Sequence, residues 1–552
     1  MISPKNPLAQ TIIQLCKSKN IKHIVISPGS RNAPLTIGFT NHSFFKCYSI
    51  VDERSAAFFA LGIAQQLREP VALVCTSGSA LLNYYPAIAE AFYSDIPLVI
   101  LSADRPKHLL GIGDGQTIHQ ENVFANHILY SVSLDNESQE ENETKIDTAL
   151  NISILHKGPV HINVSFEDPL YETVDEISIS SSSEEINFDN NSLELDDISD
   201  YLSIWNNAKR KMVLVGVNYP NEIEQQYLEI LAMDESVIVF TETTSNLHHD
   251  NFFPSIDKII APLDGEDFKI LQPDVLLTFG GMIVSKKVKA FLRKHQPNHH
   301  WHIDEKKAND TFFCLEKHFK TSVNDFFKVL FKNKNQTNSN YQNYWQSVKQ
   351  IRSKKHQQYL QNIPFSDLKV FDIILKSIPN HNMLQLGNSS AIRYAQLFDL
   401  NNTLKVFCNR GTSGIDGSTS TAIGAASVID AQTTLITGDL SFFYDSNALW
   451  NNYIPNNFRI VVINNGGGGI FRILPGDKNT ENFDTFFETK HQFTAKQLCE
   501  MYQFTYFSAS NEENLKSIMT SFYSEEKKPK LLEIFTPRTV NDEVLLDYFK
   551  SI

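Results

Sequence analysis

A repeated unit of β-branched strand, small-residue turn and amphipathic helix constrains the fold of this chain more than any other feature. Its clearest examples are His23–Ile26, which leads into Ser-Pro-Gly-Ser-Arg at 27–31, and Val71–Cys75, which leads into Thr-Ser-Gly-Ser at 76–79. Consecutive strands joined through helices are parallel, so the repeated unit predicts a parallel sheet with helices on both faces. Ligands of such sheets bind at the carboxyl ends of the strands.

The unit recurs in three blocks, which predicts an α/β protein with three doubly wound parallel-sheet domains. A chain of 552 residues is long enough for two to four domains of ordinary size. We expect the domains at residues 1–175, 200–330 and 360–552. The first and third blocks resemble each other because glycine turns follow their strands, whereas the middle block is poorer in glycine.

Polar stretches separate the three blocks. Between Asp175 and Asp200 the composition shifts to Ser, Asp, Glu and Asn, which cannot bury much apolar surface. This stretch is predicted to be a linker. The segment 333–346 is also polar and predicts a second connection, leading into a helix from Trp345.

Charge and composition exclude several classes of protein. The chain has 49 Lys and Arg against 63 Asp and Glu, a net charge of -14, which argues against general affinity for nucleic acid or anionic membrane. Any anionic ligand must therefore meet locally positive charge. The six cysteines form no C-x-x-C pair, which argues against a disulfide framework or a zinc site. Without a signal-peptide pattern or a membrane-spanning apolar run, a cytoplasmic protein is expected.

A candidate metal site stands at the ends of two apolar strands in the third block. Asp439 and Asn465 are 26 positions apart, which fits one strand-helix-strand crossover to a neighbouring parallel strand. A carboxylate and an amide oxygen suit a hard cation such as Mg²⁺, which often binds phosphate oxygens as well. The glycines at 466–469 let the backbone approach a diphosphate closely. Taken alone, a Gly-Asp pair is more often a turn and a glycine run a flexible loop.

Glu53 is a candidate for proton chemistry. It follows the strand-like Tyr48–Val51 and precedes the alanine-rich segment Ala56–Ala64. It could simply be an acidic residue at a helix N-terminus, where the helix dipole favours negative charge. Alternatively, it is a partly buried carboxylate that shares a proton with a heterocycle. The sequence by itself favours the first interpretation.

Several arginines occur in turns rather than on helix faces. Arg31, Arg105 and Arg410 lie in loops that follow strands, and Arg393 lies one helical turn after the strand end at Gly387. Guanidinium groups at strand ends form bidentate pairs with carboxylates, so in this acidic chain they predict a substrate with several carboxylates. The alternative is that each arginine holds its own loop through a salt bridge.

Glu53 in an early α/β block together with the Gly-Asp to Asn-Asn element in a late block resembles the thiamine diphosphate-dependent enzymes. Within that superfamily the chain is similar to the branch that makes 2-succinyl-5-enolpyruvyl-6-hydroxy-3-cyclohexene-1-carboxylate in menaquinone biosynthesis. The motifs that carry this resemblance lie in the first and third blocks and are Ser27–Arg31, Ser102–Pro106, Gly115–Ile118 and Asn409–Gly417.

The resemblance implies a cofactor site shared between the outer domains. The first domain would bind the aminopyrimidine and the third the diphosphate, through Mg²⁺ or Mn²⁺, with a spacer or regulatory domain between them. Glu53 would hydrogen-bond the pyrimidine ring and activate the cofactor, and Ile415 would bend the cofactor. Asp439, Asn465 and the carbonyl of Gly467 would hold the metal.

The resemblance also implies a transferase reaction with two dianionic substrates. The enzyme would decarboxylate 2-oxoglutarate and add the resulting four-carbon unit to isochorismate, as a homodimer or homotetramer. The implied substrate-binding residues are Ser30, Arg31, Arg105, Gln116, Lys286, Lys287, Ser389, Arg393, Arg410, Ile470 and Phe471. No nucleic acid and no membrane insertion are expected.

Two alternatives and one departure accompany this interpretation. Another thiamine diphosphate-dependent decarboxylase or carboligase that acts on smaller 2-oxoacids would need fewer arginines. A non-catalytic regulatory protein of the same fold would need neither Glu53 nor the metal ligands. The departure is at Gly466 and Gly469, where the resemblance leads us to expect an additional Asn and a larger side chain, so the register of the metal loop is open.

Overall fold

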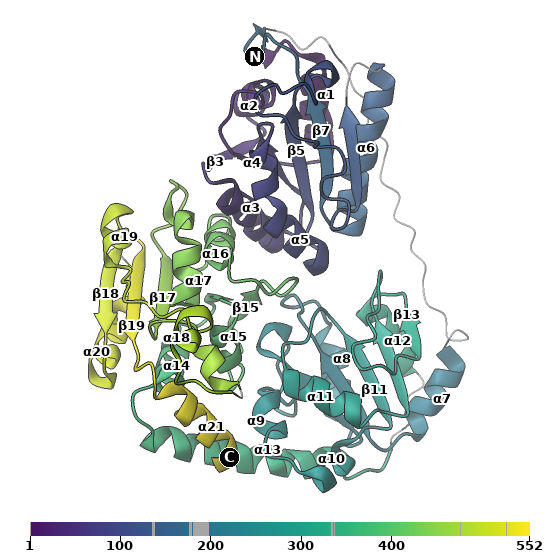
Figure 1. Cartoon of the computed structure of the whole chain (residues 1–552). Coiled ribbons are helices and arrows are strands. Elements are labelled where there is room, and N and C mark those ends of the chain that lie inside the picture. Colours follow the sequence, from purple (N-terminus) through teal and green to yellow (C-terminus); the bar gives the residue numbers. More distant parts are fainter. Residues whose placement is uncertain are drawn as a thin grey trace.

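The computed structural model describes residues 2–134, 138–175, 179, 198–332, 335, 337–474, 476–525 and 527–552. It contains three parallel sheets, each with helices on both faces, so the predicted α/β class is confirmed. In Figure 1 the first block is at the top, the middle block at the lower right and the third block at the lower left. The predicted linker between Asp175 and Asp200 lies largely outside the described residues.

The first sheet has six parallel strands. In sheet order the strands are β3 (Lys46–Ser49), β2 (His23–Ile26), β4 (Val71–Cys75), β5 (Leu98–Asp104), β7 (Val160–Ser165) and β6 (Tyr130–Leu134). The helices are α1 (Pro7–Ser18), α2 (Ala33–Thr40), α3 (Glu53–Leu67), α4 (Ser79–Asn83), α5 (Tyr85–Ser94), η1 (Lys107–Leu109) and α6 (Gln139–His156). A short antiparallel pair joins β1 (Ser3–Pro4) to β8 (Thr173–Val174).

The middle sheet has five parallel strands. In sheet order they are β10 (Val237–Thr241), β9 (Lys211–Val215), β11 (Val275–Phe279), β12 (His299–Ile303) and β13 (Lys317–Phe319). Its helices are α7 (Ser199–Asn207), α8 (Gln225–Ala232), η3 (Thr243–Ser245), α9 (Ile256–Ile260), α10 (Gly265–Leu271), α11 (Lys286–Lys294) and α12 (Val323–Lys332). The long α13 (Tyr341–Asn362) then runs below the middle block toward the third (Figure 1).

The third sheet again has six parallel strands. In sheet order they are β15 (Lys405–Cys408), β14 (Met383–Leu386), β16 (Thr433–Gly438), β17 (Phe458–Asn464), β19 (Lys530–Phe535) and β18 (Thr505–Ala509). The helices are α14 (Asp367–Ser377), α15 (Ser390–Ala395), α16 (Ser418–Ala426), α17 (Asp439–Tyr444), η4 (Ser446–Leu449), η5 (Gly469–Ile473), α18 (Glu481–Phe486), α19 (Lys496–Met501), α20 (Glu512–Phe522) and α21 (Asn541–Ser551).

Several strands consist of continuous apolar runs because both faces of each sheet are covered by helices. All five residues of β4 and of β11 are buried. A strand that faces solvent on one side alternates apolar and polar residues, whereas a central parallel strand does not. The β-branched runs in the sequence therefore located these strands well, and β2 and β4 have the predicted bounds.

Two predicted boundaries are wrong. The strand predicted to end at Val51 ends at Ser49, because Asp52 caps the next helix by accepting a hydrogen bond from the Ser55 N–H at 3.1 Å. The helix predicted from Trp345 begins at Tyr341, whose hydroxyl donates to the carbonyl of Leu271 at 2.6 Å. At Asp52 a polar side chain, rather than the apolar pattern, determines where the next helix begins.

The first and third sheets have the same strand order, so the resemblance between the outer blocks is confirmed at the level of topology. The helices after the corresponding edge strands, α3 and α16, cross in close contact within one chain. A Cβ atom on Gly62 would lie 2.0 Å from the carbonyl oxygen of Thr421, and one on Gly424 would lie 2.0 Å from that of Phe59. Glycine at both positions therefore lets the two backbones touch.

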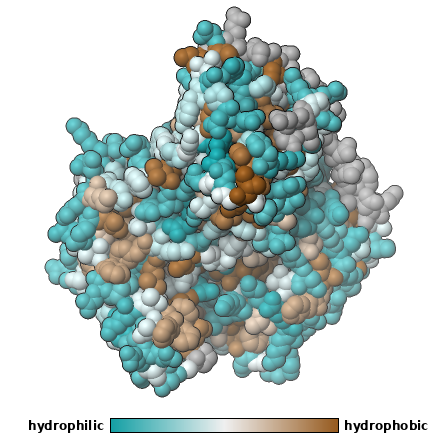
Figure 2. All heavy atoms as spheres, turned by 45° about the horizontal axis from the view of Figure 1, so that its top comes forward, coloured by the Kyte–Doolittle hydropathy of each residue, from teal (hydrophilic) through white to brown (hydrophobic). Residues whose placement is uncertain are grey.

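Within the described residues, no helix is long and apolar enough to cross a bilayer. On the face in Figure 2, hydrophobic atoms lie in separate areas among hydrophilic ones. Single exposed apolar side chains of this kind are normal in globular proteins.

Candidate active site

Loops at the carboxyl edge of the third sheet contact one another and form the core of the candidate site. The side-chain amide of Asn388, after β14, donates to the carbonyls of Asn409 and Gly414, after β15, at 2.7 Å each. The hydroxyl of Ser441, in α17, donates to the carbonyl of Ile415 at 2.9 Å. Strand order alone brings these loops to one edge, as expected for a parallel sheet.

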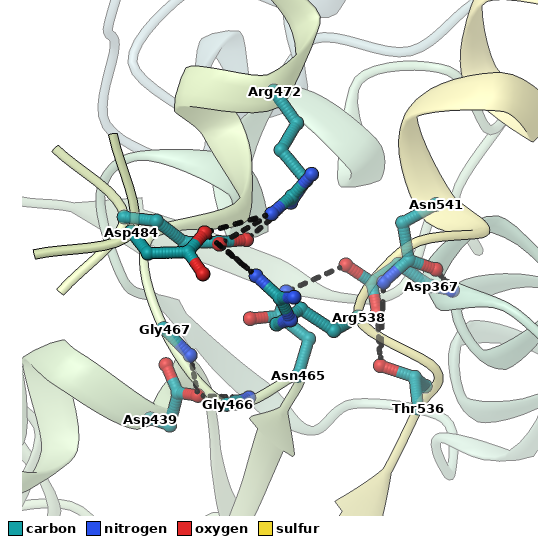
Figure 3. A network of polar contacts seen from close by, with 11 residues as sticks. Asp367, Asp439, Asn465, Gly466, Gly467, Arg472, Asp484, Thr536, Arg538 and Asn541 are labelled. Carbon is teal, nitrogen blue, oxygen red and sulfur yellow. Dashed lines mark hydrogen bonds and ion pairs between the residues drawn. The ribbon is translucent and has the colours of Figure 1, made fainter. Parts of the chain in front are cut away.

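Asp439 lies in the middle of this edge and holds the glycine loop. Its side chain is buried, and Oδ2 accepts hydrogen bonds from the N–H groups of Gly466 at 2.9 Å and Gly467 at 3.0 Å (Figure 3). β16 and β17 are neighbouring parallel strands, so the predicted crossover between Asp439 and Asn465 is confirmed. The carboxylate and the loop thus form one unit.

Two glycines of this loop, Gly466 and Gly467, have a structural cause, which accounts for the unexpected glycine at 466 but not for the one at 469. Gly466 and Gly467 have φ angles of +77° and +150°, in the region that side-chain-bearing residues rarely adopt. A Cβ atom on Gly467 would also lie 2.6 Å from the carbonyl oxygen of Glu488. The backbone of the glycine loop can therefore pack directly against the segment at Glu488, because no side chain of the loop stands between them.

The donor atoms beside Asp439 fit a hard divalent cation. Asn465 donates its amide N–H to Asp367 at 3.0 Å, which leaves Oδ1 buried without a hydrogen-bond partner. A buried oxygen without a partner is costly, and a cation would satisfy it. The described residues contain no group of three or more His, Cys, Asp or Glu suited to a metal ion. A site here would therefore combine one carboxylate with amide and backbone oxygens.

Further charged groups surround this loop, and the sequence did not single them out. Burial raises the pKa of Asp367 to about 6, while hydrogen bonds from Thr536 and Asn465 act in the opposite direction. Glu488 is fully buried and accepts hydrogen bonds from Arg472 and Arg538. Asn465 and the glycine loop thus lie among paired charges.

Arg410 presents a guanidinium group that no carboxylate neutralises among the described residues. Nη1 donates to Oδ1 of Asn388 at 2.7 Å, and Nε is buried without a hydrogen-bond partner. Arg393 lies close enough that Arg410 lowers its pKa, in addition to the larger effect of burial. Two arginines next to each other favour an anionic ligand. Ser389, which precedes α15, lies on the same edge with a φ angle of +68°.

The middle block reaches this edge through the N-terminus of α11. Lys287 and Arg393 both act electrostatically on the buried Asp257 and oppose the rise in its pKa that burial causes. The Nζ atom of Lys287 lies 4.5 Å from the ring centre of Phe549. Lys286 is exposed at the first position of the helix. Of the predicted lysine pair, Lys287 is the one that the structure brings near an arginine of the site.

Ile470 and Phe471 lie in η5, directly after the glycine loop. Phe471 is exposed, and its ring centre is 6.2 Å from that of Phe487. These apolar side chains therefore border the glycine loop.

The second set of predicted residues lies at the carboxyl edge of the first sheet. Arg31 is buried and donates to the carbonyl of Phe166 at 3.0 Å and to Asp168 at 3.2 Å. Arg105 donates through Nε to the carbonyl of Gly115 at 2.8 Å. These two arginines hold loops, as in the structural alternative stated above. Each guanidinium group has further N–H groups that can also donate to a ligand.

Glu53 is half-buried at the first position of α3, as the helix-terminus interpretation predicts. The residue after it contacts the third block of the same chain, where Arg54 donates to the carbonyl of Tyr444 at 2.8 Å. Tyr444 is the last residue of α17, whose first residue is Asp439. Within one chain, Glu53 and Asp439 thus belong to helices whose ends lie near each other.

Comparisons with known proteins agree with this arrangement. Residues 7–127 match the family model described as thiamine pyrophosphate enzyme, N-terminal TPP binding domain, and residues 197–386 match the middle domain of thiamine pyrophosphate enzymes. Curated proteins named 2-succinyl-5-enolpyruvyl-6-hydroxy-3-cyclohexene-1-carboxylate synthase are similar over nearly the whole chain. That of Flavobacterium psychrophilum is 59% identical, with 100% of both chains covered.

Two further relatives with this name are that of Christiangramia forsetii, 58% identical over 99% of this chain and 98% of its own, and that of Porphyromonas gingivalis, 39% identical over 98% and 96%. This chain belongs to that family of thiamine pyrophosphate enzymes. Thiamine pyrophosphate and thiamine diphosphate are the same molecule.

Within this thiamine pyrophosphate enzyme, the structure gathers the predicted residues into two groups. One group lies at the third sheet and the nearby α11 and consists of Lys287, Ser389, Arg393, Arg410, Ile415, Asp439, Asn465, Gly467, Ile470 and Phe471. The other lies at the first sheet and consists of Ser30, Arg31, Glu53, Arg105 and Gln116. Among the residues that the structure describes, no hydrogen bond or ion pair joins Arg31, Arg105 or Gln116 to the third sheet.

Sequence reasoning missed several residues that support the site. Asn388 holds both ends of the loop that carries Arg410, yet only its neighbour Ser389 was singled out. Asp367 and Glu488 lie 98 and 23 positions from Asn465 in the sequence. Asp367 is joined to the glycine loop through the hydrogen bond that it accepts from the Asn465 amide. Asn388 lies in a turn directly after a strand, and ligands of parallel sheets bind at the ends of strands, so the sequence could have singled it out. No local pattern marks Asp367 or Glu488.

Proposed function

We propose that this chain decarboxylates 2-oxoglutarate and adds the four-carbon product to isochorismate, giving 2-succinyl-5-enolpyruvyl-6-hydroxy-3-cyclohexene-1-carboxylate for menaquinone biosynthesis. The observation that carries the proposal is the single sheet edge shared by Asp439, the glycine loop and the arginine pair Arg393 and Arg410. Relatives of that name, similar along the full chain, support it.

We infer that Asp439, the free Oδ1 of Asn465 and the carbonyl of Gly467 hold Mg²⁺ or Mn²⁺ on the diphosphate of the cofactor. The buried Oδ1 without a hydrogen-bond partner supports this assignment. The N–H groups of Gly466 and Gly467 keep the Asp439 carboxylate oriented toward the loop. When bound, thiamine diphosphate supplies the nucleophilic carbon and the electron sink that decarboxylation requires.

Glu53 is the group we assign to cofactor activation, since a half-buried carboxylate at a helix N-terminus can share a proton with a ring nitrogen. Ile415 is held by the hydrogen bond from Ser441 to its carbonyl and gives the site an apolar side chain. Together with Ile470 and Phe471 it would exclude water. A low-dielectric environment favours loss of charge as carbon dioxide leaves.

The two substrates that we assign are both dianions. The arginine and lysine side chains of the proposed site supply positive charge for their carboxylates. Arg393 and Arg410 would bind carboxylates at the third sheet, with Ser389 as a hydroxyl partner and Lys286 and Lys287 at its margin. Arg31, Arg105, Gln116 and Ser30 would supply the remaining contacts from the first sheet. A carboxylate bound by arginine is held bidentately, which fixes its orientation.

We further propose a cytoplasmic homodimer or homotetramer. All six cysteines are free, which suits a reducing compartment. The two groups of site residues lie on different sheets without mutual hydrogen bonds, so a partner subunit could complete each site by bringing a first sheet to a third sheet.

The test is a reaction of the purified chain with thiamine diphosphate, Mg²⁺, 2-oxoglutarate and isochorismate, followed by product identification by mass spectrometry. The expected product has the mass of isochorismate plus 2-oxoglutarate less carbon dioxide. Omitting each component in turn is the control. Carbon dioxide release with no coupled product, or preference for a smaller 2-oxoacid, would instead favour a different decarboxylase or carboligase of the family.

A further inference from the structure

Glu90, in α5 of the first block, is buried against the loop that carries Arg410 in the third block. Its side chain is 1% exposed. Oε1 accepts a hydrogen bond from the N–H of Gly411 at 2.7 Å, and Oε2 accepts from the N–H of Thr412 at 2.7 Å and from its hydroxyl at 2.9 Å. Ser94 donates to Oε1 at 2.8 Å. A single carboxylate thus holds two consecutive backbone amides 321 and 322 positions away in the chain.

The loop approaches Glu90 so closely that it needs a glycine. A Cβ atom on Gly411 would lie 2.6 Å from the carbonyl oxygen of Glu90 and 3.0 Å from its Oε1. Because Gly411 has no φ in the left-handed region, close approach rather than backbone conformation explains the glycine. The contact therefore depends both on the carboxylate of Glu90 and on the missing side chain of Gly411.

Arg410 lies between two anchors. On its C-terminal side Glu90 holds Gly411 and Thr412, and on its N-terminal side Asn388 accepts from its guanidinium and donates to Asn409. Glu90 uses both carboxylate oxygens on backbone groups and forms no ion pair with Arg410 among the described residues. The acid therefore positions the arginine without neutralising it.

We propose that Glu90 is a positioning residue through which the first block sets the orientation of Arg410 for its carboxylate substrate. The inference rests on the proposed function in so far as Arg410 binds that substrate. The anchoring itself is independent of the reaction. A carboxylate is required because each of its oxygens faces a donor, whereas the amide of glutamine would turn an N–H toward Gly411 or Thr412.

Hydrogen exchange in the purified chain tests the anchoring without any substrate. In Glu90→Gln we expect the amides of Gly411 and Thr412 to exchange at least about tenfold faster, because a hydrogen bond to a charged group is lost. The matched control is Asp234→Asn, which removes another buried acid that accepts from the N–H and hydroxyl of Ser236 in the middle block. Unchanged exchange at 411 and 412 in Glu90→Gln overturns the proposal.

If Glu90→Gln does not fold, Thr412→Val serves instead, since it removes only the hydroxyl hydrogen bond to Glu90 from an exposed position. The exchange at Gly411 and Thr412 is then expected to rise about two- to tenfold. No increase in this variant also contradicts the anchoring.

A double-mutant cycle tests the route through Arg410. Glu90→Gln is expected to lower kcat/KM for the anionic substrates about tenfold or more in the wild-type background and to have no further effect in Arg410→Ala. Losses that multiply in the double variant mean that Glu90 supports the fold in general, and the positioning role is wrong. If the wild-type chain turns over neither substrate, the proposed function fails, while the exchange experiment still decides the anchoring.

Discussion

At the scale of single residues, we assign different tasks to two acids of the proposed site. Asp439 is buried among backbone donors and lies beside an oxygen of Asn465 without a partner, so it is suited to anchor charge. Glu53 begins a helix and is half-buried, so it is suited to share a proton. The difference can be measured, because binding and activation of a cofactor are separate steps.

We predict that Asp439→Ala weakens binding of thiamine diphosphate with Mg²⁺ at least about tenfold, whereas Glu53→Gln binds the cofactor nearly as well as wild type but is inactive. Isothermal titration calorimetry measures the affinities, and the release of carbon dioxide measures the activity. Equal loss of affinity in both variants would contradict the separate roles.

The arginines are predicted to divide between the two substrates. We consider four single alanine variants, at Arg31, Arg105, Arg393 and Arg410. Each should lower kcat/KM roughly ten- to a hundredfold, since a charged hydrogen bond is worth about 1.5–3 kcal/mol. At least one of the four variants should still decarboxylate 2-oxoglutarate in a single turnover and fail to form the carbon-carbon bond.

The control for the arginine series is Arg68→Ala, which breaks a partly exposed ion pair with Glu222 away from the site. This variant should keep both half-reactions. If all four site variants lose decarboxylation and coupling in equal proportion, the arginines serve one substrate or only hold loops.

At the scale of secondary-structure elements, the crossing of α3 and α16 depends on two glycines. In Gly424→Ala the new Cβ would lie 2.0 Å from the carbonyl oxygen of Phe59, so the helices must separate. We predict a loss of about 1–3 kcal/mol in the free energy of unfolding, measured by denaturant titration. The control is Gly265→Ala at the start of α10, where nothing lies within 4 Å of the added Cβ. A stable Gly424→Ala would show that the helices are not in close contact.

The contact between η3 and α11, which Glu242 makes, is predicted to make the stability of the fold depend on pH. Glu242 is buried and accepts from the N–H groups of Val284 at 2.7 Å and Ser285 at 2.6 Å, and burial raises its pKa from 4.5 to about 7. The folded state therefore binds a proton that the unfolded state releases between these two pH values, so this residue makes the fold less stable as the pH rises from 4.5 to about 7.

Replacing Glu242 by Gln removes that titration. The difference in Tm between Glu242→Gln and wild type should therefore shift in favour of the variant as the pH is raised from 4.5 to 7, measured by thermal denaturation. Glu525→Gln, an exposed position, controls for the loss of one charge. If the Tm of Glu242→Gln and the Tm of wild type change with pH in parallel, the titration of Glu242 does not affect the stability of the fold.

At the scale of the whole molecule, the question is whether one chain or two build each site. We predict that mixing Glu53→Gln with Asp439→Ala, under conditions of subunit exchange, restores part of the activity, because the family resemblance implies that the two groups serve one cofactor from different chains. Native mass spectrometry confirms the exchange. If exchanged mixtures stay inactive, both groups come from one chain, as the contact of Arg54 with Tyr444 within the chain allows.

The sequence alone determined the class of fold and the identity of the cofactor. Strands buried on both faces are apolar throughout, so continuous β-branched runs followed by small-residue turns marked β2 and β4 without any knowledge of their partners. Asp439 and Asn465 were likewise found from spacing, because a crossover between neighbouring parallel strands has a characteristic length.

Only the tertiary structure decided which distant residues support the site. Glu90 reaches the Arg410 loop, Asp367 reaches Asn465, and Gly62 meets Thr421, in each case across more than ninety positions of chain. A local sequence pattern depends on neighbouring residues and predicts strands, helices and turns. These contacts depend instead on how elements far apart in the sequence pack against one another. The same limit applies to Gly466 and Gly467, because the need for glycine there arises from backbone angles and, at Gly467, from the approach of Glu488, which no spacing encodes.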